Sequence, residues 1–479
     1  MLADEKTYWE GRITALNDLI QESLDMVDVK ELVDGIKGFS SNSNSSEEPG
    51  PGLLEAVEYE AGVLQATTRA LEDFQKFSAA ALSFFLEGFY ASPRLLARSS
   101  KVPPQLVLHT LLRELSADLE IYQRSLQQRR LVNGGVSKHL LMLSVGDRVA
   151  AAALRPAFEA KFLEQGTVIT HLGDDFDIRL IPYSPALVIE MPFTAGSSLA
   201  GKTIRPLPSH EHLALLHEVG HHVYHHGKAP NSGQTLEASL TQELFRQGIT
   251  GGLANWLEEL FADIYGLLVG GPVMALSYQE RLSQESPDAL MADSGDHPIS
   301  VLRPLIQTEV LRMIKAGSRS LYRFSPGLLD RNWTEFVGGR DLKNEIFQPQ
   351  GVSRPISGGT IVQGLAPIIQ KILDALAPLQ AMALDGAWSK DLEPGQGLSA
   401  LTDQLERGSF LGMAPASEGP DDEKRSGLVE EYQKLAGHNL SAAVWQPLFN
   451  FVGWSTEYSV GDWPSSKLSP LRVGDMPSR

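Results

Sequence analysis

The stretch over residues 213–227, LALLHEVGHHVYHHG, constrains the fold more than any other part of this chain. Residues four apart on a helix lie about 40° apart around its axis and one turn apart along it. His217 and His221 can therefore direct their imidazoles to a common point, and Glu218 stands beside that point. The apolar residues between them predict a helix that crosses a domain core and ends at Gly227.

The spacing His-Glu-x-x-His is typical of two zinc ligands with a neighbouring carboxylate. Bound zinc lowers the pKa of a water molecule to about 7, and a nearby carboxylate can then take its proton. We interpret His217 and His221 as metal ligands and Glu218 as the general base. The alternative is an ordinary buried helix with incidental histidines, because so short a pattern also arises by chance.

A second stretch, GGLANWLEELFADIYG over residues 251–266, supplies a candidate third ligand. Glu259 and Asp263 are four apart and share one helix face, and their apolar neighbours predict a buried helix. Buried carboxylates are costly unless a charge compensates them. We predict that Glu259 completes the ligand set, with water in the fourth position, and that Asp263 accepts the free N–H of a ligand histidine. The alternatives are a solvated helix face, or Glu258 as the ligand if the register is wrong.

These two motifs together resemble the gluzincin type of zinc metallopeptidase, the thermolysin-like arrangement, in which the downstream motif is Glu-x-x-x-Asp. The resemblance implies His217, His221 and Glu259 as Zn²⁺ ligands, Glu218 as general base, and Asp263 as the partner that orients His217. It covers only residues from about 180 to about 300. Because the 38 residues from His221 to Glu259 exceed the separation in thermolysin, the resemblance concerns the type of site and not that family.

Other histidines in the first motif offer rival arrangements. The metzincin pattern, with a third histidine ten residues after the first, fails because that position is Gly227. His225 lies one turn further along the same stripe and is a rival ligand. His222 and His226 face elsewhere, and we expect them to be solvated.

The segment DHPISVLR, over residues 296–303, resembles a segment that follows the third ligand in several intracellular zinc peptidases. In the functional interpretation, His297 lines the cleft and stabilises the oxyanion of a tetrahedral intermediate, while Arg303 holds the segment in place. His297 is equally well explained as a loop residue, with the following proline in the first turn of a helix. Tyr224 and Tyr265 are further candidate oxyanion donors.

Composition narrows the partners and the compartment. The net charge is −18 and no basic cluster interrupts it, which argues against nucleic acid as a partner. The chain has no cysteine, so histidines and carboxylates are left as ligands for any metal. The amino terminus lacks the order of a secretory signal, and the uncharged run at 264–278 is too short to span a membrane. We expect a cytoplasmic protein with no membrane partner, of undetermined oligomeric state.

The pattern along the chain predicts an α+β fold, mainly α. Residues 1–160 form a helical amino-terminal domain that contains a flexible linker at 38–52. Residues 161–345 form a zincin-like metallopeptidase domain, whose small β-sheet comes from three short runs within 166–193. Residues 346–479 form a helical extension. An exposed strand edge of the sheet would hold an extended peptide by β-augmentation.

The predicted function is zinc-dependent hydrolysis of a peptide bond in a peptide or protein substrate, with Glu218 activating a zinc-bound water. Two alternatives stay open. A narrow, closed cleft without a free strand edge would favour a zinc hydrolase of another amide or of a peptide-like metabolite. A fourth protein ligand, such as His225, would favour a non-enzymatic protein with a structural or vestigial zinc site.

Overall fold

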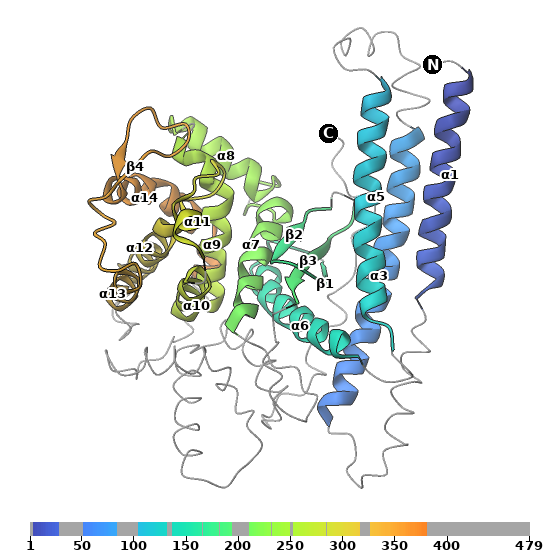
Figure 1. Cartoon of the computed structure of the whole chain (residues 1–479), viewed down its shortest axis with the longest axis horizontal. Coiled ribbons are helices and arrows are strands. Elements are labelled where there is room, and N and C mark those ends of the chain that lie inside the picture. Colours follow the sequence, from blue (N-terminus) through green and yellow to red (C-terminus); the bar gives the residue numbers. More distant parts are fainter. Residues whose placement is uncertain are drawn as a thin grey trace.

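The computed structural model describes the chain from residue 3 to residue 380 with several gaps. The described ranges are 3–27, 51–83, 104–131, 137–164, 166–181, 183–193, 210–230, 232–249, 252–283, 285–316 and 326–380. This part of the chain is mainly helical with a small sheet, as predicted (Figure 1). Most of the predicted linker lies outside the described residues, and its last two residues begin a helix. The predicted extension beyond residue 380 also lies outside them.

Four helices precede the sheet: α1 (Ala3–Asp25), α3 (Pro51–Ser83), α5 (Pro104–Gln128) and α6 (Lys138–Glu159). The first three stand side by side and bury their apolar faces against one another (Figure 1). Helix α6 begins at an N-cap, Ser137, whose hydroxyl accepts the N–H of Leu140 at 3.0 Å. Helix α6 packs on β1 and also on helices that follow the sheet.

The sheet has three strands, β1 (Thr167–Gly173), β2 (Asp177–Arg179) and β3 (Ala186–Pro192), in the order β1-β3-β2. Strands β1 and β3 are parallel, and β2 is antiparallel to β3. Both faces of β1 are covered, because Val168 and Leu172 pack in the core that α6 shares with the helices after the sheet, whereas Ile169 packs in the core of the amino-terminal helices. Strand β1 is therefore buried along its whole length instead of alternating between buried and exposed residues.

Side chains of helices close the outer edge of β1. The hydroxyl of Ser125 donates to the carbonyl of Thr170 at 2.9 Å, and the Thr170 N–H donates to Asp147 at 2.9 Å. The Gln128 amide accepts the Leu172 N–H and donates to the Leu172 carbonyl. Since these main-chain groups are already paired, β1 does not offer them to another strand. The other edge of this sheet is β2.

A buried arginine connects the helices to the edge of β1. Arg129 pairs with Asp147 and with Glu60, each at 2.7 Å, and also donates to the carbonyl of Thr170. Removing one member of so buried a pair would leave an uncompensated charge. The network therefore joins α3, α5, α6 and β1 at one point.

The two informative sequence motifs form helices that pack face to face. The first is α7 (Ala214–His226), preceded by the 3₁₀ turn η2 (His210–Leu213), and it ends at Gly227 as predicted. The second is α9 (Leu257–Gly270), preceded by η3 (Gly252–Trp256). Both helices are buried along almost their whole length. Glycines of the two helices, such as Gly220 and Gly270, allow this close approach.

The remaining elements surround this pair (Figure 1). They are α8 (Leu236–Arg246), α10 (Pro272–Leu282), α11 (Pro287–Met291), η4 (Ser300–Leu302), α12 (Arg303–Ala316), α13 (Pro326–Phe336), a hairpin of β4 (Ile346–Phe347) and β5 (Ile356–Ser357), and α14 (Gly358–Ala375). Helices α12 and α14 pack on α9, in the same core as α7. None of the helices in the described ranges has an apolar run long enough to cross a membrane.

Candidate metal centre

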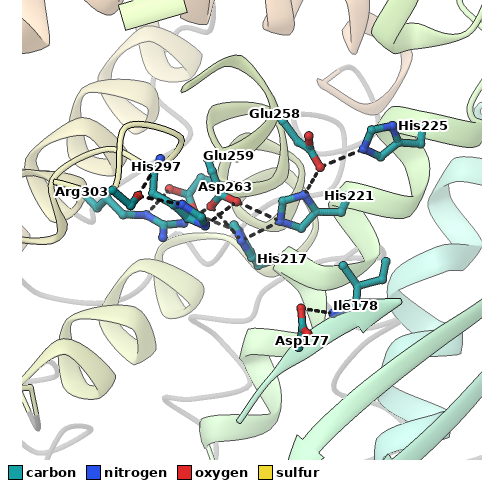
Figure 2. Close-up of polar contacts among 11 residues, drawn as sticks. Asp177, Ile178, His217, His221, His225, Glu258, Glu259, Asp263, His297 and Arg303 are labelled. Carbon is teal, nitrogen blue, oxygen red and sulfur yellow. Dashed lines mark hydrogen bonds and ion pairs between the residues drawn. The ribbon is translucent and has the colours of Figure 1, made fainter. Parts of the chain in front are cut away.

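Three side chains converge where α7 meets α9 (Figure 2). The Nε2 atoms of His217 and His221 are 3.1 Å apart. Each lies 3.4 Å from an oxygen of Glu259. Two ligands of a tetrahedral zinc ion, each about 2.0–2.1 Å from the metal, stand about 3.3 Å apart. The spacing of these three buried donors therefore fits a zinc ion, and sequence position alone had predicted the same three residues.

Carboxylates face the other nitrogen of each imidazole. His217 Nδ1 lies 3.0 Å from Asp263 Oδ1, and His221 Nδ1 lies 3.0 Å from Glu258 Oε1. Because a carboxylate only accepts hydrogen bonds, these contacts favour the tautomers with the proton on Nδ1. The lone pairs of both Nε2 atoms then point at the same place as Glu259, an arrangement that calls for a proton or a cation between them.

The charges of the cluster favour a cation as well. Burial by itself lowers the pKa of His217, but its contacts with Asp263 and Glu259 raise that pKa to about 10. Burial raises the pKa of Glu259, whereas His217, His297 and Arg303 together hold it well below its usual range. In the described structure, Glu259 Oε2 is buried without an aligned hydrogen-bond partner. A metal ion would give this oxygen a direct ligand bond in addition to its contacts with Arg303 and His217.

Glu218 follows the first candidate ligand on α7 and is buried. Burial raises the pKa of its carboxyl group, an effect that the nearby His217 and His221 partly offset. A carboxylate with a raised pKa is a better proton acceptor near neutral pH. The position and environment of Glu218 thus suit the general base predicted from the sequence, and that role stays a prediction.

Asp263 is paired with Arg303, the first residue of α12. Arg303 Nε and Nη2 donate to the two oxygens of Asp263 at 3.1 and 2.8 Å, and Nη2 lies 3.3 Å from Glu259 Oε2. The guanidinium also lies over the ring of Tyr278. We expected Arg303 to hold the segment of His297. The structure pairs Arg303 with two buried carboxylates of α9, as a buried guanidinium requires, and its role in holding that segment stays a prediction.

His297 lies at the rim of the cluster. Its side chain is 53% exposed, and Nε2 is 3.1 Å from Glu259 Oε1. Its Nδ1 lies 3.1 Å from the hydroxyl of Ser294. The contact with Glu259 raises the pKa of His297. His297 thus lies beside Glu259, whereas its predicted place in a substrate cleft and its role as an oxyanion donor stay predictions.

The two tyrosines considered as oxyanion donors point elsewhere. The hydroxyl of Tyr265 donates to the carbonyl of Ala153 on α6 at 2.7 Å. Tyr224 packs on Phe261, and its hydroxyl interacts with Thr241 on α8. Each ring serves the packing between helices, so neither interpretation holds.

The other histidines of α7 lie outside the cluster. His225 uses Nε2 to contact Glu258 at 2.8 Å and Nδ1 to contact Glu237 at 3.2 Å, so it is not one of the converging donors. His222 is buried and packs on the ring of His226. The expectation of solvated side chains is wrong for His222, because α7 is covered on both sides.

Sequence reasoning missed the role of Glu258, which contacts the outward nitrogen of His221 and not the metal side. It also missed the pairing of Arg303 with Asp263. No spacing within a single helix links position 258 to position 221, or position 303 to position 263.

No protein-family model matches this chain, and comparisons with curated proteins and with solved structures gave no match either. The site is a buried cluster of two imidazoles and one carboxylate, and the carboxylate of Glu218 is buried near it.

Proposed function

We propose that this chain is a zinc-dependent hydrolase of peptide bonds with a gluzincin-type site in a zincin-like domain. The observation that carries the proposal is the convergence of His217, His221 and Glu259 at distances of 3.1 to 3.4 Å. Two imidazoles and one carboxylate form a catalytic zinc set that leaves one position for water. Among the described residues, no fourth histidine or carboxylate joins this group, which favours a catalytic over a structural site.

The surrounding side chains supply the rest of the chemistry. A bound zinc ion would act as a Lewis acid and make a water molecule easier to deprotonate. Glu218 takes a proton from the attacking water and later delivers it to the leaving amine. His297, at the rim, donates to the oxygen of the scissile carbonyl as charge develops there. Asp263 and Arg303 keep the imidazole of His217 oriented.

The sheet supports a peptide as the substrate. Its β1 edge is closed by helix side chains, whereas β2 is the other edge and lies against α7. Figure 2 labels Asp177 and Ile178 of β2, the strand that contacts α7. The N–H of Ile178 already donates to the carboxylate of Asp177, a bond that a peptide pairing with this N–H would have to replace. An extended peptide that paired with β2 by β-augmentation would lie on the strand that packs on α7, the helix of the two histidines.

The test is the zinc content of the purified full chain, compared with that of His221→Ala, followed by hydrolysis of a quenched fluorescent peptide library. We expect one zinc ion per chain, loss of zinc in His221→Ala, and peptide cleavage that needs Glu218. A wild-type protein that takes up no zinc when zinc is supplied would overturn the proposal. Zinc binding with cleavage of small amides but of no peptide would favour the alternative, a hydrolase of a non-peptide amide.

A further inference from the structure

Glu258 lies between two histidines of α7 (Figure 2). A single oxygen, Oε1, is 3.0 Å from His221 Nδ1 and 2.8 Å from His225 Nε2. The other nitrogen of His225 lies 3.2 Å from Glu237 on α8. These contacts form a continuous chain from a residue of α8, through α7 and α9, to the second candidate metal ligand.

We propose that Glu258 is a positioning residue for the metal site, which fixes the ring of His221 and is itself held in place by His225. This inference rests on the proposed zinc site. A ligand histidine that donates its outer N–H to a carboxylate is fixed in tautomer and orientation, and it becomes a more basic ligand. Glu258 does this for His221, whereas Asp263 lies 3.0 Å from His217 Nδ1 without an aligned hydrogen bond.

The two supports differ in their surroundings. Asp263 is 2% exposed, and both of its carboxylate oxygens accept hydrogen bonds from Arg303. Glu258 is 40% exposed, and its partner His225 is 22% exposed. Solvent and salt screen exposed charges much more than buried ones. The contact of Glu258 with His221 is therefore weaker than that of Asp263 with His217, and raised salt should weaken it further.

His225 explains why an exposed glutamate keeps one orientation. A free glutamate side chain on a helix surface samples several rotamers. His225 lies one turn beyond His221 on the same stripe of α7, so that Glu258 bridges two successive turns of the neighbouring helix. His225 is therefore assigned to the support of a ligand and not to the ligand set.

The experiment measures the zinc affinity of the full chain by competition with a chromophoric chelator, without any assay of activity. The variants are Glu258→Ala, Glu258→Gln and His225→Ala. The control is Glu243→Gln, which removes an acid of α8 that bonds to Gln247 and lies outside this chain of contacts. We expect Glu258→Ala to weaken zinc binding about 10- to 100-fold. We expect a smaller loss for Glu258→Gln, which keeps an acceptor, and no change for the control.

A second readout separates positioning from general damage to the fold. In the Co²⁺-loaded protein, the visible absorption spectrum reports the geometry of the ligands, so Glu258→Ala and His225→Ala should both change it. Raised salt should reduce the difference in zinc affinity between wild type and Glu258→Gln. Melting curves of the metal-free proteins identify any variant that has not folded. Zinc affinity and cobalt spectra are then compared among the variants that have folded.

The possible failures are distinguishable. Wild-type zinc affinity and cobalt spectra in folded Glu258→Ala and His225→Ala would overturn the positioning role and leave the proposed function standing. Absence of metal binding in the wild type would overturn both. Complete loss of zinc in Glu258→Gln, as large as in Glu259→Ala, would also overturn the inference, because it would make Glu258 a ligand.

Discussion

Gly220 lies against the main chain of Ala262 at the crossing of α7 and α9. A Cβ atom at position 220 would stand 2.6 Å from the Cα of Ala262 and 2.9 Å from its carbonyl oxygen. Gly220 is flanked along α7 by the two candidate ligand histidines, and Ala262 lies within one turn of Glu259 on α9. The distance between these two residues therefore sets the distance between the two halves of the metal cluster.

Gly220→Ala should push the two helices apart and weaken the metal site. Overpacking of this kind costs about 1–3 kcal/mol of stability. We expect that loss in urea denaturation, together with a weaker zinc affinity in chelator competition. The matched control is Gly62→Ala in α3, where an added Cβ meets nothing within 4 Å. That substitution should stabilise the protein by about 0.5–1 kcal/mol, because alanine is the better helix former. Zinc affinity in Gly220→Ala equal to that of the wild type would contradict the prediction.

Glu218→Gln should separate catalysis from metal binding. The glutamine keeps the size of the side chain but cannot take a proton, so the rate of peptide hydrolysis should fall at least ~10²–10⁴-fold. Zinc content should stay the same, because Glu218 is not one of the three converging donors. Rate and zinc content are measured on the same preparation, with Glu243→Gln as the control. If Glu218→Gln hydrolysed peptides at the wild-type rate, another group would have to be the base.

Arg303→Met should destabilise the metal-free protein and increase its dependence on zinc. The substitution leaves Asp263 and Glu259 buried without the guanidinium that pairs with both. Breaking a buried pair from one side costs about 3–5 kcal/mol. Zinc would replace part of the missing positive charge, so the rise in melting temperature on adding zinc should exceed that of the wild type. A rise equal to the wild-type value would show that Arg303 and the metal do not share this role.

His171 should make stability depend on pH below neutrality. Burial lowers the pKa of this β1 residue to about 4, although Glu190 partly opposes the shift. Between the unfolded pKa of about 6.5 and the folded value, only the unfolded chain binds the proton. Stability is therefore complete above this window, falls as the pH drops through it, and loses about 3 kcal/mol in all.

Urea denaturation between pH 7 and pH 4 checks this prediction. His171→Gln removes the titrating group, so the variant should lose less stability across the window than the wild type. The control is His139→Gln, which replaces an exposed histidine at the start of α6. Parallel curves for the wild type and His171→Gln would show that His171 does not cause the slope.

Some features of the site could be predicted from local sequence. The i, i+4 spacing that puts His217 and His221 on one face follows from the geometry of a single helix, as does the spacing of Glu259 and Asp263. Their apolar neighbours also predicted that both helices are buried. Short β-rich runs between prolines and glycines located the three strands.

Other features required the tertiary structure. Glu258 and Arg303 contact His221 and Asp263 across helix–helix interfaces, and no local periodicity links these positions. The closed edge of β1 depends on Gln128 and other helix side chains far away in sequence.

The sequence by itself thus determined which side chains share a helix face, because the backbone geometry of one helix sets that. Only the tertiary structure decided which nitrogen faces which carboxylate and which strand edge is closed by helix side chains. Those relationships depend on how separate helices and strands pack, and packing is set by the shapes of all the side chains between them.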